Sequence, residues 1–150
     1  EDEVCDMYEL TCDKLEAAGL KQYEISNFAV PGFESRHNLK YWRDEEYLGI
    51  GTAAHSFADG RRFFFPQDIN AFIEGAGTAD DGPGGSFEEK VMLGLRLTEG
   101  VSGLPADFVR RVAERSDLAP FVSADKTTLK LNRRGFLISN RVISEILEMI

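Results

Sequence analysis

The chain has 150 residues, of which 43% are hydrophobic and 29% charged, and its formal net charge is −9. This length supports one domain or two small ones, and the composition excludes a disordered tail, a collagen-like fibre and a disulfide-rich secreted mini-protein. An acidic chain repels phosphate backbones, so we expect no general nucleic-acid binding. No apolar run approaches the roughly 18 residues of a membrane helix, and no signal-peptide pattern opens the chain. We therefore expect a cytoplasmic protein with no transmembrane segment.

The first elements are predicted to be a helix and a short strand. Apolar residues recur at helical spacing over 4–18, and Gly19 then ends the helix. Residues 22–26 alternate, with Tyr23 and Ile25 on one face and Glu24 on the other, which is typical of a strand. One strand makes no sheet, so we interpret the chain as a piece of a longer protein. The predicted apolar face of the helix consists of Val4, Met7, Tyr8, Thr11, Leu15 and Ala18.

Both cysteines fall in this predicted helix. Cys5 and Cys12 are seven residues apart, which in a helix separates their Cα atoms by about 10.5 Å, beyond the roughly 7 Å limit for a disulfide. Two cysteines alone also cannot hold an iron–sulfur cluster or a zinc ribbon. We interpret them as free thiols in a reducing compartment.

Chemistry-bearing residues gather after the strand. Pro31 and Gly32 signal a turn, and residues 35–43 then combine one histidine, one asparagine, two large aromatics and three bases. The small-residue loop at 49–56 contains a Gly-x-Gly, but it lacks the third glycine of a dinucleotide site, and no Gly-Lys-Ser/Thr exists for a P-loop. A strand at 61–65 is predicted next, ended by Pro66. Asp68 can cap a following helix that carries Ile69, Phe72 and Ile73.

The last half of the chain is predicted to be mainly helical. The Gly-rich run at 75–86 has the composition of a linker. Ser86 and Glu89 form a capping box for a helix that ends near Thr98, and Pro105 opens a second helix. A hairpin with its turn at 124–126 and a final helix over 134–149 complete a small winged-helix-like unit. The second helix places Phe108, Val109, Val112 and Ala113 inward and Arg110, Arg111 and Arg115 outward.

Two motifs point to a known family. The chain carries YEISNFA at residues 23–29 and HNxxYW at residues 37–42. With these runs it resembles the C-terminal part of the HemW-type heme chaperones, the oxygen-independent coproporphyrinogen III oxidase-like proteins of the radical SAM superfamily. The resemblance continues through 49–56, 89–96 and 134–140. The HNxxYW motif separates the chaperone branch from the true coproporphyrinogen dehydrogenase.

The resemblance implies a parent protein of well over twice this length. Its missing N-terminal part would be a partial β/α barrel that holds a [4Fe–4S] cluster on a CxxxCxxC motif and binds S-adenosylmethionine. Cys5 and Cys12 do not fit that spacing, so we expect no radical chemistry from this chain alone. Thr52-Ala53 departs from the family, which more often has proline followed by a small residue.

We therefore expect an α+β fold in two parts. Residues 1–74 would form the C-terminal edge of the radical SAM barrel with the HNxxYW segment. Residues 75–85 would be the linker, and residues 86–150 the HemN-type C-terminal helical domain, a winged-helix-like unit with a β-hairpin.

The HNxxYW segment has the residue types that a heme contact needs. Neutral imidazole is a common axial ligand of heme iron, which makes His37 the candidate metal ligand. Tyr41 and Trp42 can stack on the porphyrin face, with Asn38 beside them. If the segment is helical, His37 and Tyr41 share a face. The cations that can pair with the propionates are Arg36, Lys40 and Arg43.

A structural interpretation of the same residues stays open. His37 and Asn38 can cap or brace a loop, and Trp42 can be part of the core. For His55, in the small-residue loop, structural hydrogen bonding is favoured over lining the cofactor cavity.

Three functions follow from these observations. The first is a heme chaperone, which binds heme and passes it to recipient heme proteins. The second is part of an oxidative decarboxylase that acts on coproporphyrinogen III. The third is a winged-helix nucleic-acid module, but residues 99–150 hold only eight bases against seven acids, and a solvated helix face explains the arginines better. Its support is Arg110, Arg111, Arg115, Arg133, Arg134 and Arg141.

Overall fold

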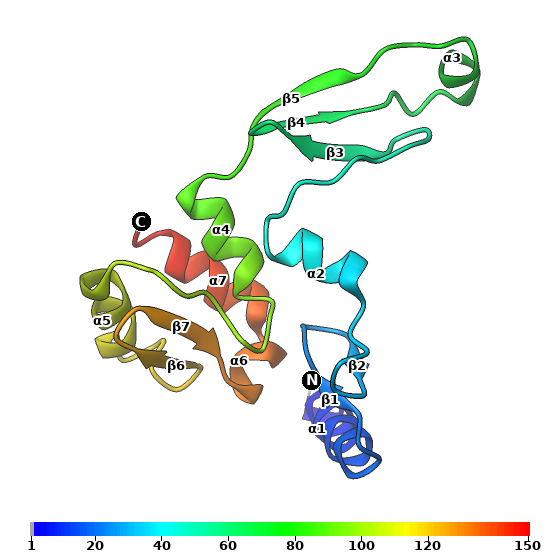
Figure 1. Ribbon diagram of the computed structural model, residues 1–150. Coiled ribbons are helices and arrows are strands. Elements are labelled where there is room, and N and C mark those ends of the chain that lie inside the picture. The colour runs from blue at the N-terminus through cyan, green and yellow to red at the C-terminus, as the bar shows by residue number, and fades with distance from the viewer. Residues whose placement is uncertain (1) are drawn as a thin grey trace.

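The computed structural model describes residues 2–150 and shows a mixed helix-and-strand chain, which confirms the α+β class. Within these residues the strands form three small antiparallel sheets. The first pairs β1 (Lys21–Gln22) with β2 (Phe28–Ala29), the second consists of β3 (His55–Ala58), β4 (Arg61–Phe64) and β5 (Ala79–Pro83), and the third pairs β6 (Val122–Asp125) with β7 (Thr128–Leu131). The sheet β3–β5, with α3 (Ile69–Ile73) at its far end, extends as an arm away from a body made of β6–β7 and the helices α4–α7, which lie within residues 87–147 (Figure 1). Across residues 2–150, no helix combines the length and apolar character needed to cross a membrane.

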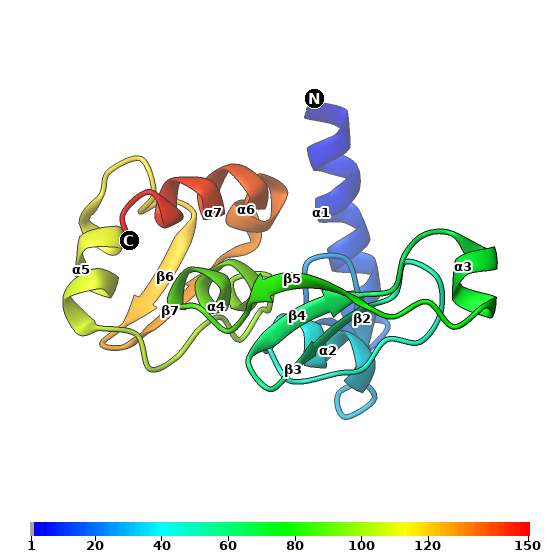
Figure 2. The ribbon, with the colours of Figure 1, turned by 90° about the horizontal axis from the view of Figure 1, so that it is seen from above.

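Helix α1 (Asp2–Ala17) ends as predicted, because Gly19 adopts a positive φ of 82° that favours glycine. Its predicted apolar face is only partly correct, since Val4 and Met7 are largely exposed. The helix instead turns Cys12 inward, where it contacts the β1 side of the molecule. Figure 2 shows why: the first turns of α1 project beyond the neighbouring elements, so nothing in the described chain covers them.

The strand predicted at 22–26 is shorter in the structure. It consists of β1 (Lys21–Gln22), which pairs with β2 (Phe28–Ala29). Glu24 lies beyond β1 and is 1% exposed, although a carboxylate was not expected on the buried side. The reason is a backbone bridge from Glu24 to Leu97, which joins the N-terminal segment to the body. The Glu24 carboxylate accepts a hydrogen bond from the Ser26 amide at 3.1 Å.

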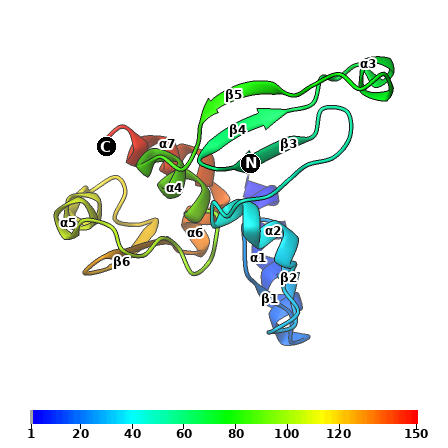
Figure 3. The same ribbon diagram turned by 45° about the horizontal axis from the view of Figure 1, so that its top comes forward.

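Helix α2 (Arg36–Trp42) precedes the arm, which begins with β3 (His55–Ala58), β4 (Arg61–Phe64) and α3 (Ile69–Ile73). The strand predicted at 61–65 is confirmed to within one residue. Asp68 caps α3 as predicted, accepting hydrogen bonds from two backbone amides. Figures 1 and 3 both place α2 between the arm sheet and the pair β1–β2.

The linker predicted at 75–85 is wrong for its central residues. Strand β5 (Ala79–Pro83) pairs with β4 and completes the arm sheet. One of the glycines that suggested a linker has a packing role, because a Cβ at Gly84 would lie 2.7 Å from the Phe57 ring. Glycine therefore permits a close approach here rather than flexibility. The division of the chain into two domains stays a prediction.

The apolar core lies in the body. It is built by α4 (Phe87–Gly94), α5 (Ala106–Glu114), β6 (Val122–Asp125), β7 (Thr128–Leu131), α6 (Arg133–Leu137) and α7 (Ser139–Leu147). The inward face predicted for the second of these helices is confirmed for Phe108, Val109 and Val112, and Ala113 is half-buried. The hairpin is also confirmed, with its turn at 126–127 rather than 124–126.

Two helix boundaries in the body differ from the prediction. Helix α4 ends at Gly94 rather than near Thr98, because Leu97 leaves the helix to form the bridge with Glu24. The final helix is not continuous. Ile138 has φ −123° and ψ 32°, outside the helical region, and separates α6 from α7. A β-branched residue has a lower helix propensity, which favours a break at this position.

Candidate functional site

Helix α2 carries the HNxxYW motif and begins with a side-chain cap. The Ser35 hydroxyl accepts a hydrogen bond from the Asn38 amide at 3.3 Å. The segment is therefore a helix capped by Ser35, and the alternative in which His37 and Asn38 cap a loop is not what the structure shows. One turn apart, His37 and Tyr41 meet as predicted, with ring centroids 4.8 Å apart and 3.1 Å between His37 Nε2 and Tyr41 Oη.

The motif divides between two faces of α2. Tyr41 packs edge to face against Tyr47, with centroids 4.4 Å apart, so His37, Tyr41 and Tyr47 form one row of rings. Trp42 faces the body instead, where the Arg96 guanidinium lies 5.4 Å from its ring. The Trp42 indole nitrogen is buried and has no hydrogen-bond partner within residues 2–150. The structure thus joins His37 to Tyr41 and favours the core interpretation of Trp42.

Two of the three cations predicted for propionates are held by carboxylates. The Arg43 guanidinium donates to both carboxylate oxygens of Glu99 at 3.0 and 3.3 Å, and this hydrogen bonding raises the pKa of Arg43. Lys40 lies 3.7 Å from Glu45. Arg36 is exposed and has no carboxylate within 4 Å in the part of the chain that the structure describes. Arg36 is thus the cation of α2 best able to meet an incoming anion.

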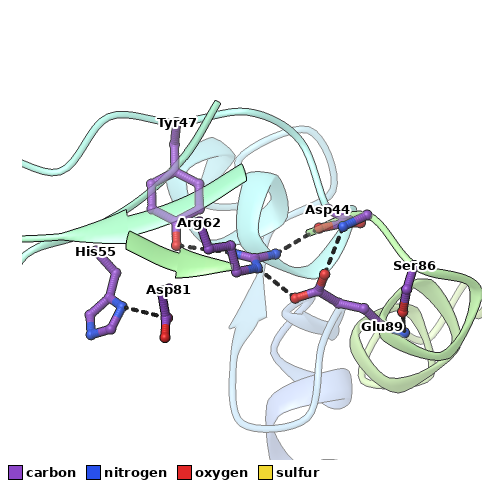
Figure 4. A network of polar contacts seen from close by, with 8 residues as sticks. Asp44, Tyr47, His55, Arg62, Asp81, Ser86 and Glu89 are labelled. Atoms are coloured by element: carbon purple, nitrogen blue, oxygen red, sulfur yellow. Dashed lines mark hydrogen bonds and ion pairs between the residues drawn. The ribbon is translucent and has the colours of Figure 1, made fainter. Parts of the chain in front are cut away.

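A largely buried ion-pair network lies beside this row of rings (Figure 4). Arg62 on β4 donates from Nε to Glu89 at 2.6 Å and from Nη2 to Asp44 at 2.8 Å, and its guanidinium lies 4.5 Å from the centre of the Phe57 ring. The three charged side chains are only 10–19% exposed. Burial raises the pKa of Asp44, and the charge of Glu89 adds to this, against the lowering effect of Arg62.

This network fastens the arm to the rest of the molecule. Asp44 follows α2, Glu89 belongs to the first turn of α4, and Arg62 comes from the arm. Tyr47 joins the network to the ring row, because its hydroxyl lies 3.5 Å from Arg62 Nη1. A cavity of about 270 Å³ opens here, lined by Tyr41, Asp44, Glu45, Tyr47, Arg62, Glu89 and Leu93.

Sequence reasoning missed this network. Glu89 was expected only in a capping box, and its carboxylate does accept the Gly85 amide at 2.8 Å while Ser86 accepts the Glu89 amide. No sequence spacing links Asp44, Arg62 and Glu89, because they meet only where β4 lies against the end of α2 and the start of α4. Asp44 also has a positive φ of 55°, which nothing in its local sequence indicated.

His55 lies at the start of β3 rather than in a loop. Its ring stacks on Phe64, with centroids 5.1 Å apart and planes at 27°, and its Nδ1 lies 3.6 Å from the Asp81 carboxylate. The neighbouring Ser56 is buried and accepts a hydrogen bond from the Gly49 amide at 3.0 Å. No contact between His55 and α2 is found in residues 2–150, so the structure holds the two histidines on different elements.

The residues of α2 can supply one wall of a heme site. Among residues 2–150, no group of three or more His, Cys, Asp or Glu side chains is placed to hold a metal ion. Heme iron needs only an axial nitrogen from the protein, and the porphyrin needs an apolar face. His37 is exposed and uses one ring nitrogen for Tyr41, which leaves Nδ1, and Tyr41 and Tyr47 supply adjacent aromatic surface. The side chains present therefore fit heme on one side.

The arginines of the body are mostly neutralised by carboxylates. Arg110 pairs with Asp107 and Glu114 on α5, Arg115 pairs with Asp117 and Glu145, and Arg133 pairs with Asp13 and Glu16. Such pairs leave little free positive charge on this surface, so they give no new support to a nucleic-acid module.

The fold has a solved counterpart. Coproporphyrinogen III oxidase (HemN) from Escherichia coli, described as a radical SAM enzyme, matches 97% of the chain with a TM-score of 0.62 at 14% sequence identity, and the chain covers 41% of that structure. This likeness assigns the fold to the HemN class.

Sequence comparison identifies the family within this fold class. The chain is 32% identical to the heme chaperone HemW of Bacillus subtilis and 36% identical to that of Synechocystis, over 98% and 79% of the chain. It is 47% identical over 64 residues to the heme chaperone HemW of Escherichia coli. The chain spans 43% of the Bacillus protein and 31% of the Synechocystis protein. No family model matches. The chain belongs to the HemW heme chaperones, and the resemblance stated from its motifs is confirmed.

Proposed function

We propose that the chain is the C-terminal, heme-binding part of a radical SAM-type heme chaperone that passes heme to recipient heme proteins. The observation that carries this proposal is the exposed pair of His37 and Tyr41, continued by Tyr47. In this proposal His37 offers an axial nitrogen, the two tyrosines offer one wall for the porphyrin, and Arg36 meets a propionate. Bound heme would supply an iron centre that a recipient protein takes over.

The other residues of the segment have supporting roles in this proposal. Trp42 and Asn38 hold the second face of α2, and the Trp42 ring contacts Arg96 on the α4 side. Arg43 and Lys40, already paired with Glu99 and Glu45, orient the helix and are secondary candidates for propionates. His55 belongs to the arm and lies on a different element from the residues of α2.

The iron–sulfur cluster and the S-adenosylmethionine site belong, in this proposal, to parts of the parent protein outside this chain. We propose that residues 1–74 form the C-terminal edge of a barrel that holds the [4Fe–4S] cluster and S-adenosylmethionine, and that residues 86–150 form the HemN-type, winged-helix-like domain. The fold likeness to HemN and the HemW names of the relatives support this assignment. We also propose that the protein works in the cytoplasm.

A second candidate function is oxidation of coproporphyrinogen III. The fold likeness to the coproporphyrinogen III oxidase of Escherichia coli favours it. Because that likeness comes with 14% identity, whereas relatives named heme chaperone reach 32–36% over most of the chain, we place the chaperone function first.

Two assays on the full-length protein separate the candidates. The chaperone proposal predicts a stable complex with hemin and transfer of that hemin to an apo-heme protein, without decarboxylation of coproporphyrinogen III. Product formation from coproporphyrinogen III without hemin binding would overturn the proposal and favour the oxidase.

A further inference from the structure

One face of the arm sheet carries a second histidine site. His55 and Phe57 are two residues apart on β3, so they point to the same face, and their partners across the β3–β4 pair are Phe64 and Arg62. Tyr47 pairs with Phe57 on the other edge of β3, with backbone hydrogen bonds of 2.8 and 2.9 Å. Tyr47 and His55 are therefore diagonal neighbours on this face, about 7–8 Å apart by the geometry of antiparallel strands.

A carboxylate lies beside the ring of His55. The β4–β5 pairing shifts register between Arg62 and Phe63, and Asp81 is the extra residue that this shift leaves unpaired. Its carboxylate lies 3.6 Å from His55 Nδ1, and Figure 4 shows the two side chains facing each other. Stacking on Phe64 holds the plane of the ring from one side.

A carboxylate beside one ring nitrogen is also found at histidine ligands of metals, although at 3.6 Å the contact of His55 with Asp81 is longer than a hydrogen bond. A ligating histidine directs its second ring N–H to a carboxylate or carbonyl, which fixes the tautomer and leaves the other nitrogen as a lone pair. In His55 the carboxylate faces Nδ1, so Nε2 is the free nitrogen, and the side chain is 58% exposed. His37 has the opposite arrangement, because its Nε2 is the nitrogen that contacts Tyr41.

We propose that His55, oriented by Asp81, is a second ligand for the iron of the heme that His37 binds. It lies on the sheet face that it shares with Tyr47. The identity of this ligand as heme rests on the proposed function. The row of rings from His37 through Tyr41 to Tyr47 runs from the first imidazole toward the sheet face that carries the second.

The first test needs no heme. In protein labelled with ¹⁵N-histidine at about pH 8, where imidazole is neutral, NMR reports which ring nitrogen carries the proton. We expect His55 to be the Nδ1–H tautomer and Asp81→Asn to shift it toward Nε2–H. The matched control is Asp80→Asn, which removes the same charge from the carboxylate that pairs with Arg61. An Nε2–H tautomer in the wild type, or equal effects of the two variants, would overturn the orienting role.

The second test uses hemin and full-length protein. We expect His37→Ala to bind hemin more weakly, with a shifted Soret band, but to keep a residual histidine-ligated spectrum that the double variant His37→Ala/His55→Ala loses. In the His37→Ala background, Asp81→Asn should weaken hemin binding about tenfold, and Asp80→Asn should not. Identical spectra for the single and double variants would overturn the assignment of His55 as an iron ligand. Absence of hemin binding by the wild type would show that heme is not the ligand of His55 and would overturn the proposed function. The NMR result would still decide whether Asp81 orients His55.

Discussion

Arg62 connects three separate elements through one guanidinium, and its neighbours are nearly buried. Replacing it with methionine keeps most of its length but leaves Asp44 and Glu89 facing each other without a cation. Breaking a buried ion pair in this way is typically costly, so we expect Arg62→Met to lower the free energy of unfolding by about 3 kcal/mol. Urea denaturation measures this change.

The adjacent arginine provides the control for that experiment. Arg61 pairs with Asp80 on the exposed side of the same sheet. Exposed pairs contribute little, so Arg61→Met should leave the urea midpoint nearly unchanged. Equal destabilisation by the two substitutions would show that the network at Arg62 has no special role.

Asp44 and Asp80 should respond to pH in opposite directions. The pKa of Asp44 is raised, mainly by burial, so its contribution to stability is largest at acid pH and is lost as pH rises through the raised pKa. The pKa of Asp80 is lowered, mainly by its hydrogen bond from Arg61, so its contribution is present at neutral pH and is lost as pH falls.

This difference is measured by comparing unfolding at neutral pH and near pH 4, the ordinary aspartate range. Relative to Asp44→Asn, the wild type should gain stability on acidification. Relative to Asp80→Asn, it should lose stability. The same sign for both comparisons would contradict the assignment of Asp44 as a buried carboxylate.

At the scale of single residues, sequence reasoning found the local contacts and missed the distant ones. The pair of His37 and Tyr41 follows from helical spacing, and the caps at Asp68 and Ser86 follow from their positions before helices. The partners of Arg62 could not be predicted in this way, because they depend on how β4 is placed against α2 and α4.

At the scale of elements, strand β5 gives the sharpest contrast between composition and structure. A Cβ at Gly84 would overlap the Phe57 ring, whereas a Cβ at Gly77 meets nothing within 4 Å in the described chain. We expect Gly84→Ala to destabilise the protein by about 1–3 kcal/mol and Gly77→Ala to have no comparable effect, as measured by thermal unfolding. A flexible linker would tolerate both substitutions equally.

Limited proteolysis tests the same segment in another way. Because β5 is hydrogen-bonded to β4, residues 79–83 should resist cleavage, and the first cut inside 75–86 should fall in the segment 75–78. Initial cleavage at 100–116 would mean that the division predicted between the two parts is wrongly placed.

The element boundaries that sequence reasoning misplaced share one physical cause. The end of α4 and the buried position of Glu24 both depend on the bridge between Glu24 and Leu97, which joins residues 73 positions apart. Local periodicity does not carry such information. Where an element depended on its own cap or hairpin, as in α3 and β6–β7, the prediction was correct.

At the scale of the whole molecule, the arm and α2 together form the surface on which the proposed function depends. The Arg62 network holds the arm against α2 and α4. Tyr47 contacts both Arg62 and Tyr41, and Tyr41 contacts His37. The candidate heme ligand thus rests on a connected set of side chains rather than on a single exposed helix. The fold class followed from the pattern of helices and strands, but this connection required the structure.

The most direct test of the central claim is the hemin spectrum of full-length His37→Ala protein, recorded alongside its melting temperature. With wild-type stability retained, we expect the Soret band to shift or weaken and hemin affinity to fall, because an axial nitrogen has been removed. An unchanged Soret band and unchanged hemin affinity in a variant of wild-type stability would contradict the account.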